Sequence, residues 1–168
     1  MQDEQDRLTR RVLWSLPSGL YLIGTCAQDR VNLMTANWVS QVATTPRILA
    51  ASLEVASVTL GLARAGGGFS VSILAKEDRA VIRRFVKPST GLDADGEGGS
   101  TMAGEEVRLG TAGRPHLARA VGVLEVDLVA ETAFDSHVVL FGEVTDALEL
   151  RPGTPVLEMG DTRMNYGG

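Results

Sequence analysis

The sequence predicts one mainly β domain, a closed or partly closed β-barrel with a few short helices. Three observations support this fold class. Short apolar runs rich in β-branched side chains recur along the chain, and Gly, Pro, Asp and Ser residues that favour turns separate them. No internal repeat and no second apolar core interrupts the 168 residues. We therefore expect residues 1–168 to form a single domain.

Residues 1–13 are mostly polar and predict a short N-terminal helix. Leu8, Val12 and Leu13 are spaced so that they share one face of that helix. The segment is therefore either an ordinary terminal helix or an arm that covers a partner. Pro17-Ser18-Gly19 is a poor continuation for a helix and ends this element.

Strands are predicted wherever an apolar run lies between turn residues. We expect them at residues 20–27, 31–42, 47–53, 69–74, 122–131 and 137–145. Gln28-Asp29-Arg30 is a hairpin turn, so the second strand pairs back on the first. Thr44-Thr45-Pro46 ends the second strand, because proline has no backbone N–H to donate.

Two further helices and one loop are predicted between these strands. Residues 57–65 form a helix that Ser57 caps and Gly66-Gly67-Gly68 ends. Residues 76–86 show helical spacing of their apolar side chains. Residues 89–106 are rich in glycine and acidic side chains, so we expect a flexible surface loop there, either a plain loop or a lid.

Composition excludes several classes of function. Hydrophobic residues make up 44% of the chain and charged residues 22%, as in ordinary globular proteins. The formal net charge of -5 argues against broad nucleic-acid binding, which needs a basic surface. The N-terminus lacks the order of a secretion signal, and no apolar stretch approaches the ~18 residues of a membrane span. The expected location is the cytoplasm.

The cysteine and histidine residues do not predict a metal site. Cys26 is the single cysteine, so no intramolecular disulfide can form, and its apolar neighbours favour a buried hydrophobic role. Zinc needs more ligands than this cysteine and the two separated histidines, His116 and His137, supply. We therefore expect no metal.

The strand predicted over residues 31–42 carries polar or amphipathic side chains near the middle of both faces. Thr35 and Asn37 lie on one face and Trp38 on the other, because side chains alternate along a strand. The pattern leaves two interpretations open, a strand with one solvated side or the edge of a ligand site. In the second, Thr35 and Asn37 hydrogen-bond the ligand, and Ala36 lets backbone amides approach it.

The start of the helix predicted at residues 57–65 suits a phosphate group. Helix N-termini present free amides and a partial positive charge, and Ser57 and Thr59 add hydroxyl donors. The alternative is a simple N-cap. Gly66-Gly67-Gly68 lacks the Gly-x-Gly-x-x-Gly order and precedes a strand, so a Rossmann-type nucleotide site is not indicated.

Two segments nearer the C-terminus add candidate ligand contacts. His137 opens an apolar strand after a short polar turn, and it is either structural or a contact to a ligand at the strand end. Arg163 and Tyr166 lie near the end of the sequence, in either a loose polar tail or a segment that folds over the site. In the second case the arginine pairs with phosphate and the tyrosine stacks on a ring.

In this order, the segments resemble the flavin reductase-like family, whose fold is the FMN-binding split barrel of Greek-key type. The matching residues are Asn32-x-Met34-Thr35-Ala36-Asn37-Trp38-x-Ser40-Gln41, Pro46, Ser52-Leu53, Thr59, Gly68-Phe69-Ser70-Val71-Ser72-Ile73-Leu74, Asp135-x-His137-x-x-Leu140-Phe141-Gly142-Glu143-Val144 and Tyr166-Gly167-Gly168. The likeness covers about residues 12–168, and the order and spacing of the motifs carry it.

The resemblance implies a homodimer with each flavin, FMN or FAD, near the subunit interface. The residues that it implies for the flavin and its phosphate are Thr35, Ala36, Asn37, Trp38, Ser52, Leu53, Ser57 and Thr59. Ser72 stands where many members have asparagine, and it keeps a shorter hydrogen-bonding group. His137 takes the nicotinamide position, with Tyr166 and Arg163 near the same pocket.

The activity that the resemblance implies is that of an NAD(P)H:flavin oxidoreductase. Hydride passes from the nicotinamide of NADH or NADPH to flavin N5, and reduced flavin goes to a monooxygenase component. The cofactors carry this chemistry, so no catalytic side chain is assigned and His137 orients the nicotinamide. The alternatives are an FMN-binding protein for electron transfer or sensing without nicotinamide turnover, a split-barrel module for another ligand such as haem, and a barrel without cofactor.

Overall fold

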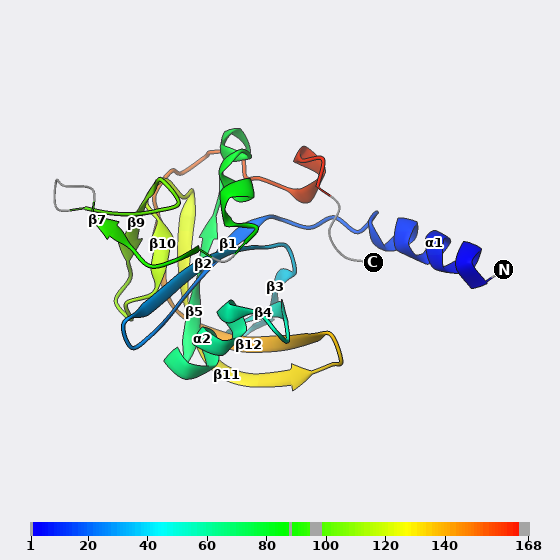
Figure 1. Cartoon of the computed structure of the whole chain (residues 1–168), viewed down its shortest axis with the longest axis horizontal. Coiled ribbons are helices and arrows are strands. Elements are labelled where there is room, and N and C mark those ends of the chain that lie inside the picture. The colour runs from blue at the N-terminus through cyan, green and yellow to red at the C-terminus, as the bar shows by residue number, and fades with distance from the viewer. Residues whose placement is uncertain (1, 88, 95–98, 165–168) are drawn as a thin grey trace.

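The computed structural model describes residues 2–87, 89–94 and 99–164 of the chain (Figure 1). Its helical elements are α1 (Gln2–Leu13), α2 (Val58–Gly66) and the short 3-10 segments η1 (Lys76–Asp78), η2 (Val81–Phe85) and η3 (Met159–Asp161). Its strands are β1 (Tyr21–Ala27), β2 (Arg30–Ala36), β3 (Val39–Thr44), β4 (Arg47–Glu54), β5 (Gly68–Ile73), β6 (Ser89–Thr90), β7 (Asp93–Ala94), β8 (Ser100–Met102), β9 (Glu105–Leu109), β10 (Pro115–Leu117), β11 (Gly122–Ala133) and β12 (His137–Glu149).

These strands form two antiparallel sheets. The large sheet has the order β3-β4-β12-β11-β5-β1-β2-β6, and the small sheet has the order β10-β9-β8-β7. The large sheet curls so that side chains from β1, β2, β4, β5, β11 and β12 meet in one core. Its end strands, β3 and β6, are not paired with each other in the described part of the chain, so the barrel is split. The predicted mainly β, split-barrel class is confirmed.

The apolar run of β1 serves two cores at once. Leu22 lies in an outer core that the small sheet and η2 cover, and Ile23 lies in an inner core that the large sheet encloses together with α2. Side chains alternate along a strand, so a strand buried on both faces must be apolar at consecutive positions. The backbones also approach closely here, because a Cβ on Gly24 would lie 1.8 Å from the Pro115 carbonyl oxygen.

The helix α2 is capped at both ends as the sequence predicts. Ser57 Oγ accepts a hydrogen bond from the Leu60 N–H at 3.2 Å. At the other end Gly67 has a φ of 70°, and its N–H donates to the Ala63 carbonyl. Glycine adopts this left-handed conformation without steric cost, so the helix ends there.

Three predicted elements differ from the structure. Residues 31–42 are not one strand, because β2 ends and β3 begins on either side of Asn37 and Trp38, and the two strands lie near opposite ends of the large sheet. Residues 76–86 hold two 3-10 segments instead of one helix. Residues 89–106 contain β6, β7, β8 and the start of β9 in place of a continuous loop, and Met102 of β8 is buried in the outer core.

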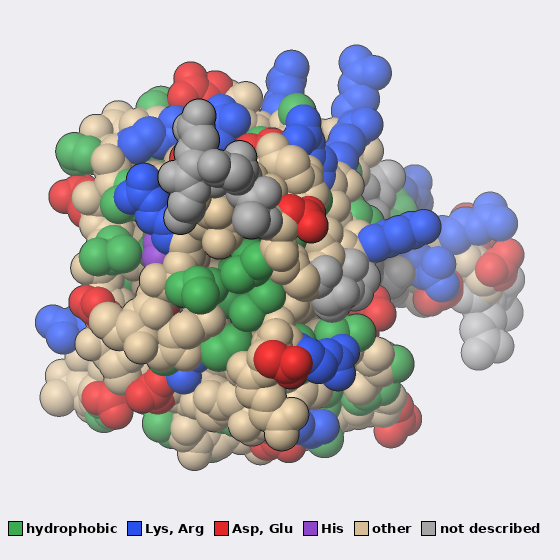
Figure 2. Space-filling view, turned by 60° about the vertical axis from the view of Figure 1, so that its left-hand side comes forward, with side chains coloured by type: hydrophobic (Ala, Val, Ile, Leu, Met, Phe, Trp, Pro, Cys, Tyr) green, Lys and Arg blue, Asp and Glu red, His purple; other side chains and the backbone are tan. Residues whose placement is uncertain are grey.

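The predicted N-terminal helix is present, and it extends away from the body of the molecule (Figure 1). Residues 3–13 are all exposed. No helix in the described part of the chain is long and apolar enough to cross a membrane. Figure 2 shows acidic and basic side chains both spread over the face that it presents.

Candidate functional site

A groove of about 960 Å³ opens where α1 joins the body. Residues 13–19 and Tyr21 form its first wall, and residues 158–160 with Thr162 and Met164 form its third. The second wall consists of Asn37, Trp38, Val39, Ser40, Ala50, Ser52 and Val139. The volume is within the range of small-molecule and cofactor sites.

Backbone pairing holds the first and third walls together. The Met159 N–H donates to the Ser18 carbonyl at 2.8 Å, and Gly19 pairs with Glu158 in an isolated bridge. A Cβ on Gly19 would lie 2.2 Å from the Tyr21 hydroxyl oxygen, so a larger residue there would displace the Tyr21 ring. Burial, with the carboxylate of Glu158, raises the pKa of Tyr21 above its ordinary value. Sequence reasoning missed this wall, for which the helix break at residues 17–19 was the available signal.

The corner between β2 and β3 places an aromatic pair beside the groove. The Trp38 carbonyl accepts from the Ser52 N–H at 2.9 Å, which ties the corner to β4. The Trp38 and His137 ring centroids are 5.0 Å apart with their planes at 59°, a tilted arrangement favourable for aromatic rings. His137 Nδ1 lies 2.9 Å from Ser136 Oγ. Trp38 is 40% exposed, so part of its ring is open to a ligand.

Three of the residues predicted to contact a flavin line this groove, namely Asn37, Trp38 and Ser52. Two others do not, because Ala36 and Leu53 are buried in the inner core. The corner separates Ala36 from Asn37 and Trp38, and the alternation of side chains along β4 separates Ser52 from Leu53. The chain leaves β2 at Ala36 and changes direction, so the residues on either side of the corner face different surroundings.

The hydroxyl groups of two more predicted contact residues form hydrogen bonds within the fold. Thr35 Oγ1 donates to the Ile82 carbonyl at 2.8 Å and joins β2 to η2. Ser72 is buried, and its Oγ accepts from the Leu117 N–H at 3.1 Å, which joins the large sheet to the small one. Neither side chain is part of the groove lining.

The hydroxyls predicted to bind phosphate at the start of α2 also have partners within the fold. Ser57 is the N-cap of the helix. Thr59 is buried, and its Oγ1 accepts from Asn32 Nδ2 at 2.8 Å and lies 3.2 Å from Met34 Sδ, to which it donates. Thr59 therefore offers no hydroxyl to a phosphate at this helix start, whereas the Ser57 hydroxyl still has a proton to donate beside the backbone amides.

The C-terminal candidates divide between described and undescribed residues. Arg163 is exposed and lies between Thr162 and Met164, which both line the groove. Tyr166 lies outside the described residues. The described lining of the groove contains no Lys or Arg side chain. Arg163, which was predicted to pair with phosphate, lies next to the lining in the chain but is not part of it.

The lining as a whole suits a planar aromatic ligand with polar edges. Trp38 offers a ring face, and Asn37, Ser40 and Ser52 offer neutral hydrogen-bonding groups. A flavin ring system has this combination of a flat apolar body and a polar pyrimidine edge, so the residues present fit its ring portion.

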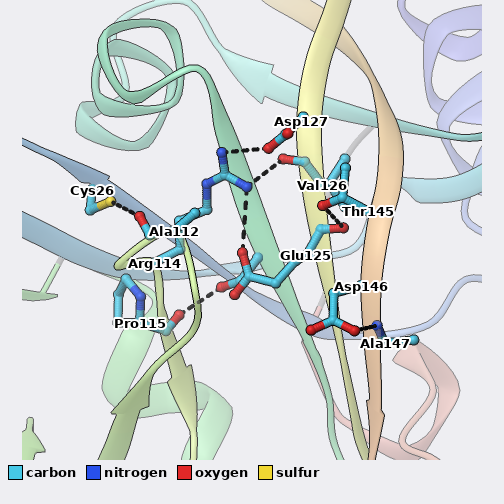
Figure 3. Close-up of polar contacts among 11 residues, drawn as sticks. Cys26, Ala112, Arg114, Pro115, Glu125, Val126, Asp127, Thr145, Asp146 and Ala147 are labelled. Carbon is cyan, nitrogen blue, oxygen red and sulfur yellow. Dashed lines mark hydrogen bonds and ion pairs between the residues drawn. The ribbon is translucent and has the colours of Figure 1, made fainter.

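A second polar cluster lies outside the groove, where Arg114 meets β11 (Figure 3). The Arg114 guanidinium, 3% exposed as a residue, donates to Glu125 at 3.4 Å, to the Val126 carbonyl at 3.0 Å and to Asp127 at 2.8 Å. Burial raises the pKa of Glu125, and Arg114 opposes that shift. A Cβ on Gly68 would lie 2.4 Å from Arg114 Nη2. Sequence reasoning missed this cluster. The available signal was the pair of acidic residues Glu125 and Asp127, two positions apart on β11.

Comparison with known proteins adds to this geometry. Residues 13–166 match the family described as "Flavin reductase like domain". The high molecular weight rubredoxin of Moorella thermoacetica is 33% identical over 148 residues, which are 87% of this chain and 62% of that protein. The chain therefore spans less than two thirds of the length of this curated relative.

Two solved structures share the fold. An NADH:FAD oxidoreductase from Streptomyces globisporus C-1027 is 22% identical, with 98% of this chain and 95% of that chain covered and a TM-score of 0.78. A nitrilotriacetate monooxygenase component B from Mycobacterium thermoresistibile is 21% identical, with 94% and 84% covered and a TM-score of 0.77.

Proposed function

The chain belongs to the flavin reductase-like domain family, and we propose that it is an NAD(P)H:flavin oxidoreductase that binds FMN in the groove. The observation that carries the proposal is the tilted ring pair of Trp38 and His137 beside a groove with polar edges. A bound flavin supplies the hydride acceptor for reduced nicotinamide. The task left to the protein is to hold the two rings in register and keep bulk water away.

The proposed roles follow from the groove walls. Trp38 packs on the face of the ring system, and Asn37 and Ser52 hydrogen-bond its polar edge. His137 orients the nicotinamide through its position beside Trp38. Arg163 pairs with a phosphate of either nucleotide, and Tyr166 closes over the same pocket.

The cofactor and partner follow from the family and from the similar proteins. FMN is the proposed cofactor, and FAD is the alternative because the similar Streptomyces protein is named an NADH:FAD oxidoreductase. We propose a homodimer. A monooxygenase component that receives reduced flavin is supported by the name of the similar nitrilotriacetate protein.

Steady-state oxidation of NADH and of NADPH, each with FMN and with FAD, tests the proposal. We expect flavin-dependent turnover with at least one donor, well above the rate of free flavin without protein. No turnover with either donor would refute reductase activity. The visible spectrum of the purified protein addresses the alternative ligands, since a Soret band indicates haem and a colourless protein that leaves FMN fluorescence unchanged indicates a barrel without cofactor.

A second candidate is an FMN-binding electron-transfer protein that reduces a rubredoxin-type iron centre. The 33% identity to a high molecular weight rubredoxin favours it. The test mixes photoreduced flavoprotein with a separate oxidised rubredoxin and follows the bleaching of the iron centre in a stopped-flow instrument. Rapid bleaching in a protein that shows no NADH or NADPH oxidation would favour this candidate over the reductase.

A further inference from the structure

The helix α1 has one face without charge. At 100° per residue, one side of the helix carries neutral and apolar side chains, namely Gln5, Leu8, Thr9, Val12 and Leu13. The other side carries the charged ones, namely Asp3, Glu4, Asp6, Arg7, Arg10 and Arg11. Such a division is typical of a helix that lies on a surface.

The neutral face of α1 is not covered by the described part of its own chain. Leu8 is 44% exposed and Val12 is 60% exposed, and the helix stands off the body (Figure 1). A single helix of 12 residues is marginally stable in water, because its few hydrogen bonds barely offset the cost of nucleation. Packing of its neutral face on another surface would supply the missing stabilisation.

The body carries an exposed surface at the β11–β12 turn, which we call the tip patch and define as Val55, Phe134, Asp135 and Ser136, with Val55 and Phe134 as its apolar members. Val55 is 48% exposed and Phe134 is 61% exposed. The Val55 N–H donates to the Ser136 carbonyl at 3.1 Å, so the end of β4 and the β11–β12 turn lie side by side. Asp135 is exposed at the edge of the patch.

We propose that α1 of one copy packs its neutral face on the tip patch of a second copy. Leu8 and Val12 cover Phe134 and Val55, and an arginine from the charged face, such as Arg11, approaches Asp135. The exchange is reciprocal in a two-fold dimer, in which each copy both gives an arm and receives one. The inference stands on the arm and the patch, and it does not depend on the proposed reductase activity.

The placement of the two surfaces favours a second copy of this chain as the partner. The root of α1 forms the first wall of the groove, and the tip patch adjoins His137, which stacks on Trp38 in the second wall. Arm and patch thus flank the same groove, so a two-fold axis near the groove brings each arm to the other copy's patch. A membrane surface fits less well, because the three acidic and three basic side chains of α1 cancel and offer anionic lipid no net attraction.

Docking would also fix a wall of the groove. Leu13, the last residue of α1, and Trp14, the residue after it, line the groove, so the position of the helix sets the position of that wall. The ligand site of one copy would then depend on the partner's patch.

Sedimentation velocity over a concentration series tests the docking in the full chain. We expect a dimer for the wild type and an increase of at least ~10-fold in its dissociation constant for Leu8→Ser/Val12→Ser. Asp3→Ser/Arg7→Ser is the matched control, since it places two serines on the charged face, leaves the net charge unchanged and should leave the dimer unchanged. Equal dissociation constants for all three proteins, or a monomeric wild type, would overturn the proposal.

Disulfide trapping tests where α1 packs on the second copy. In a Cys26→Ser background, the variants Leu8→Cys and Phe134→Cys are mixed and oxidised, and we expect a covalent dimer that neither variant forms alone. Arg7→Cys with Phe134→Cys is the control and should remain uncoupled. No covalent dimer in the first mixture overturns the proposal. A disulfide within one monomer of the double variant Leu8→Cys/Phe134→Cys would also overturn it, because the helix would then pack on its own copy. A wild type that is monomeric in solution and pellets with phosphatidylglycerol vesicles would overturn it in favour of a membrane surface.

Discussion

The groove and the Arg114 cluster are both rich in polar side chains, but they differ in how those side chains are satisfied. Around Arg114, Nη1 and Nη2 donate within the fold to two carboxylates and a carbonyl, while Arg114 Nε and Glu125 Oε1 are buried without a hydrogen-bond partner among the described residues. In the groove, Asn37, Ser40 and Ser52 line an open volume. Polar groups that already have partners hold a fold together, whereas groups presented to an open cavity remain available for a ligand.

The same contrast runs through the hydroxyl groups. Thr59 and Ser72 are buried and bound to protein atoms, so they serve the inside of the barrel. Ser52 belongs to the same barrel, yet it lines the groove. Substitutions in the two regions should therefore separate into losses of stability and losses of ligand-dependent activity.

The largest effect is expected from Arg114→Met. It leaves Glu125 and Asp127 without their cation, and breaking a buried ion pair typically costs about 3–5 kcal/mol of unfolding free energy. Urea denaturation measures the loss. The control is Arg108→Met, which removes an exposed pair with Glu106 and should cost about 1 kcal/mol or less. A loss equal to that of the control would show that the buried cluster does not stabilise the fold.

The next effect concerns the groove. Trp38→Ala removes the exposed ring beside His137, and we expect kcat/KM for the nicotinamide donor to fall by ~10- to 100-fold because the reacting rings lose their alignment. Its unfolding free energy should change by about 1 kcal/mol or less, as for other exposed positions. Leu109→Ala, an exposed apolar residue of β9, is the control for both assays. Unchanged kcat/KM would remove Trp38 from the site.

A third test uses Thr59, which the sequence assigned to phosphate binding. Thr59→Val keeps the shape of the side chain but leaves Asn32 Nδ2 without its acceptor, at a cost of about 1–3 kcal/mol. The affinity for FMN, measured by fluorescence titration, should not change. Weaker FMN binding in the folded Thr59→Val variant would restore Thr59 to the phosphate site.

Ser57→Ala removes the cap of α2 and should cost about 1 kcal/mol of unfolding free energy.

The smallest expected effect is a pH dependence. Burial and then the charge of Arg108 lower the pKa of His116, so the folded protein binds this proton less readily than the unfolded chain. Its contribution to stability is therefore complete above the ordinary histidine pKa of about 6.5 and is lost as the pH falls below that value. The raised pKa of Glu125 has the opposite effect on stability. The folded state takes up that proton more readily than the unfolded chain, so acidification favours folding through this group.

Urea midpoints at about pH 7.5 and about pH 5.5 isolate the histidine. His116→Gln should lose less stability on acidification than the wild type. His137→Gln, at a half-exposed position, serves as the control and should follow the wild type. A wild-type response in His116→Gln would show that this imidazole does not couple folding to protons.

Local patterns were sufficient for most of the barrel. The caps of α2, the hairpin at residues 28–30 and the long β11–β12 pair follow from turn residues and apolar runs, which act over a few neighbours. Strand alternation over residues 31–42 failed at Asn37 and Trp38, because the apolar pattern continues while the chain changes its pairing partner from β1 to β4. A pattern within one segment carries no information on which strand pairs with it.

The same limit applies to where the candidate site residues lie in the fold. Thr59 looked like a phosphate donor because it lies in the first turn of a helix, but it shares the buried side of α2 with Leu60 and Ala63. Residues 89–106 looked like a loop from their composition, although Met102 anchors β8 in the outer core. Residue type and spacing identified the family, and three-dimensional packing decided which of its residues face the groove.

The segment of β1 from Leu22 to Gly24 is buried on both faces and paired on both edges. Leu22 and Ile23 lie in different cores, and β2 and β5 pair with its two edges. Exchange of its amide protons with deuterium therefore requires that both cores open together, which is global unfolding. The slowest-exchanging amides of this strand should report the full free energy of unfolding, while those of α1 exchange early, so one deuterium labelling series records both limits of local stability in the same molecule.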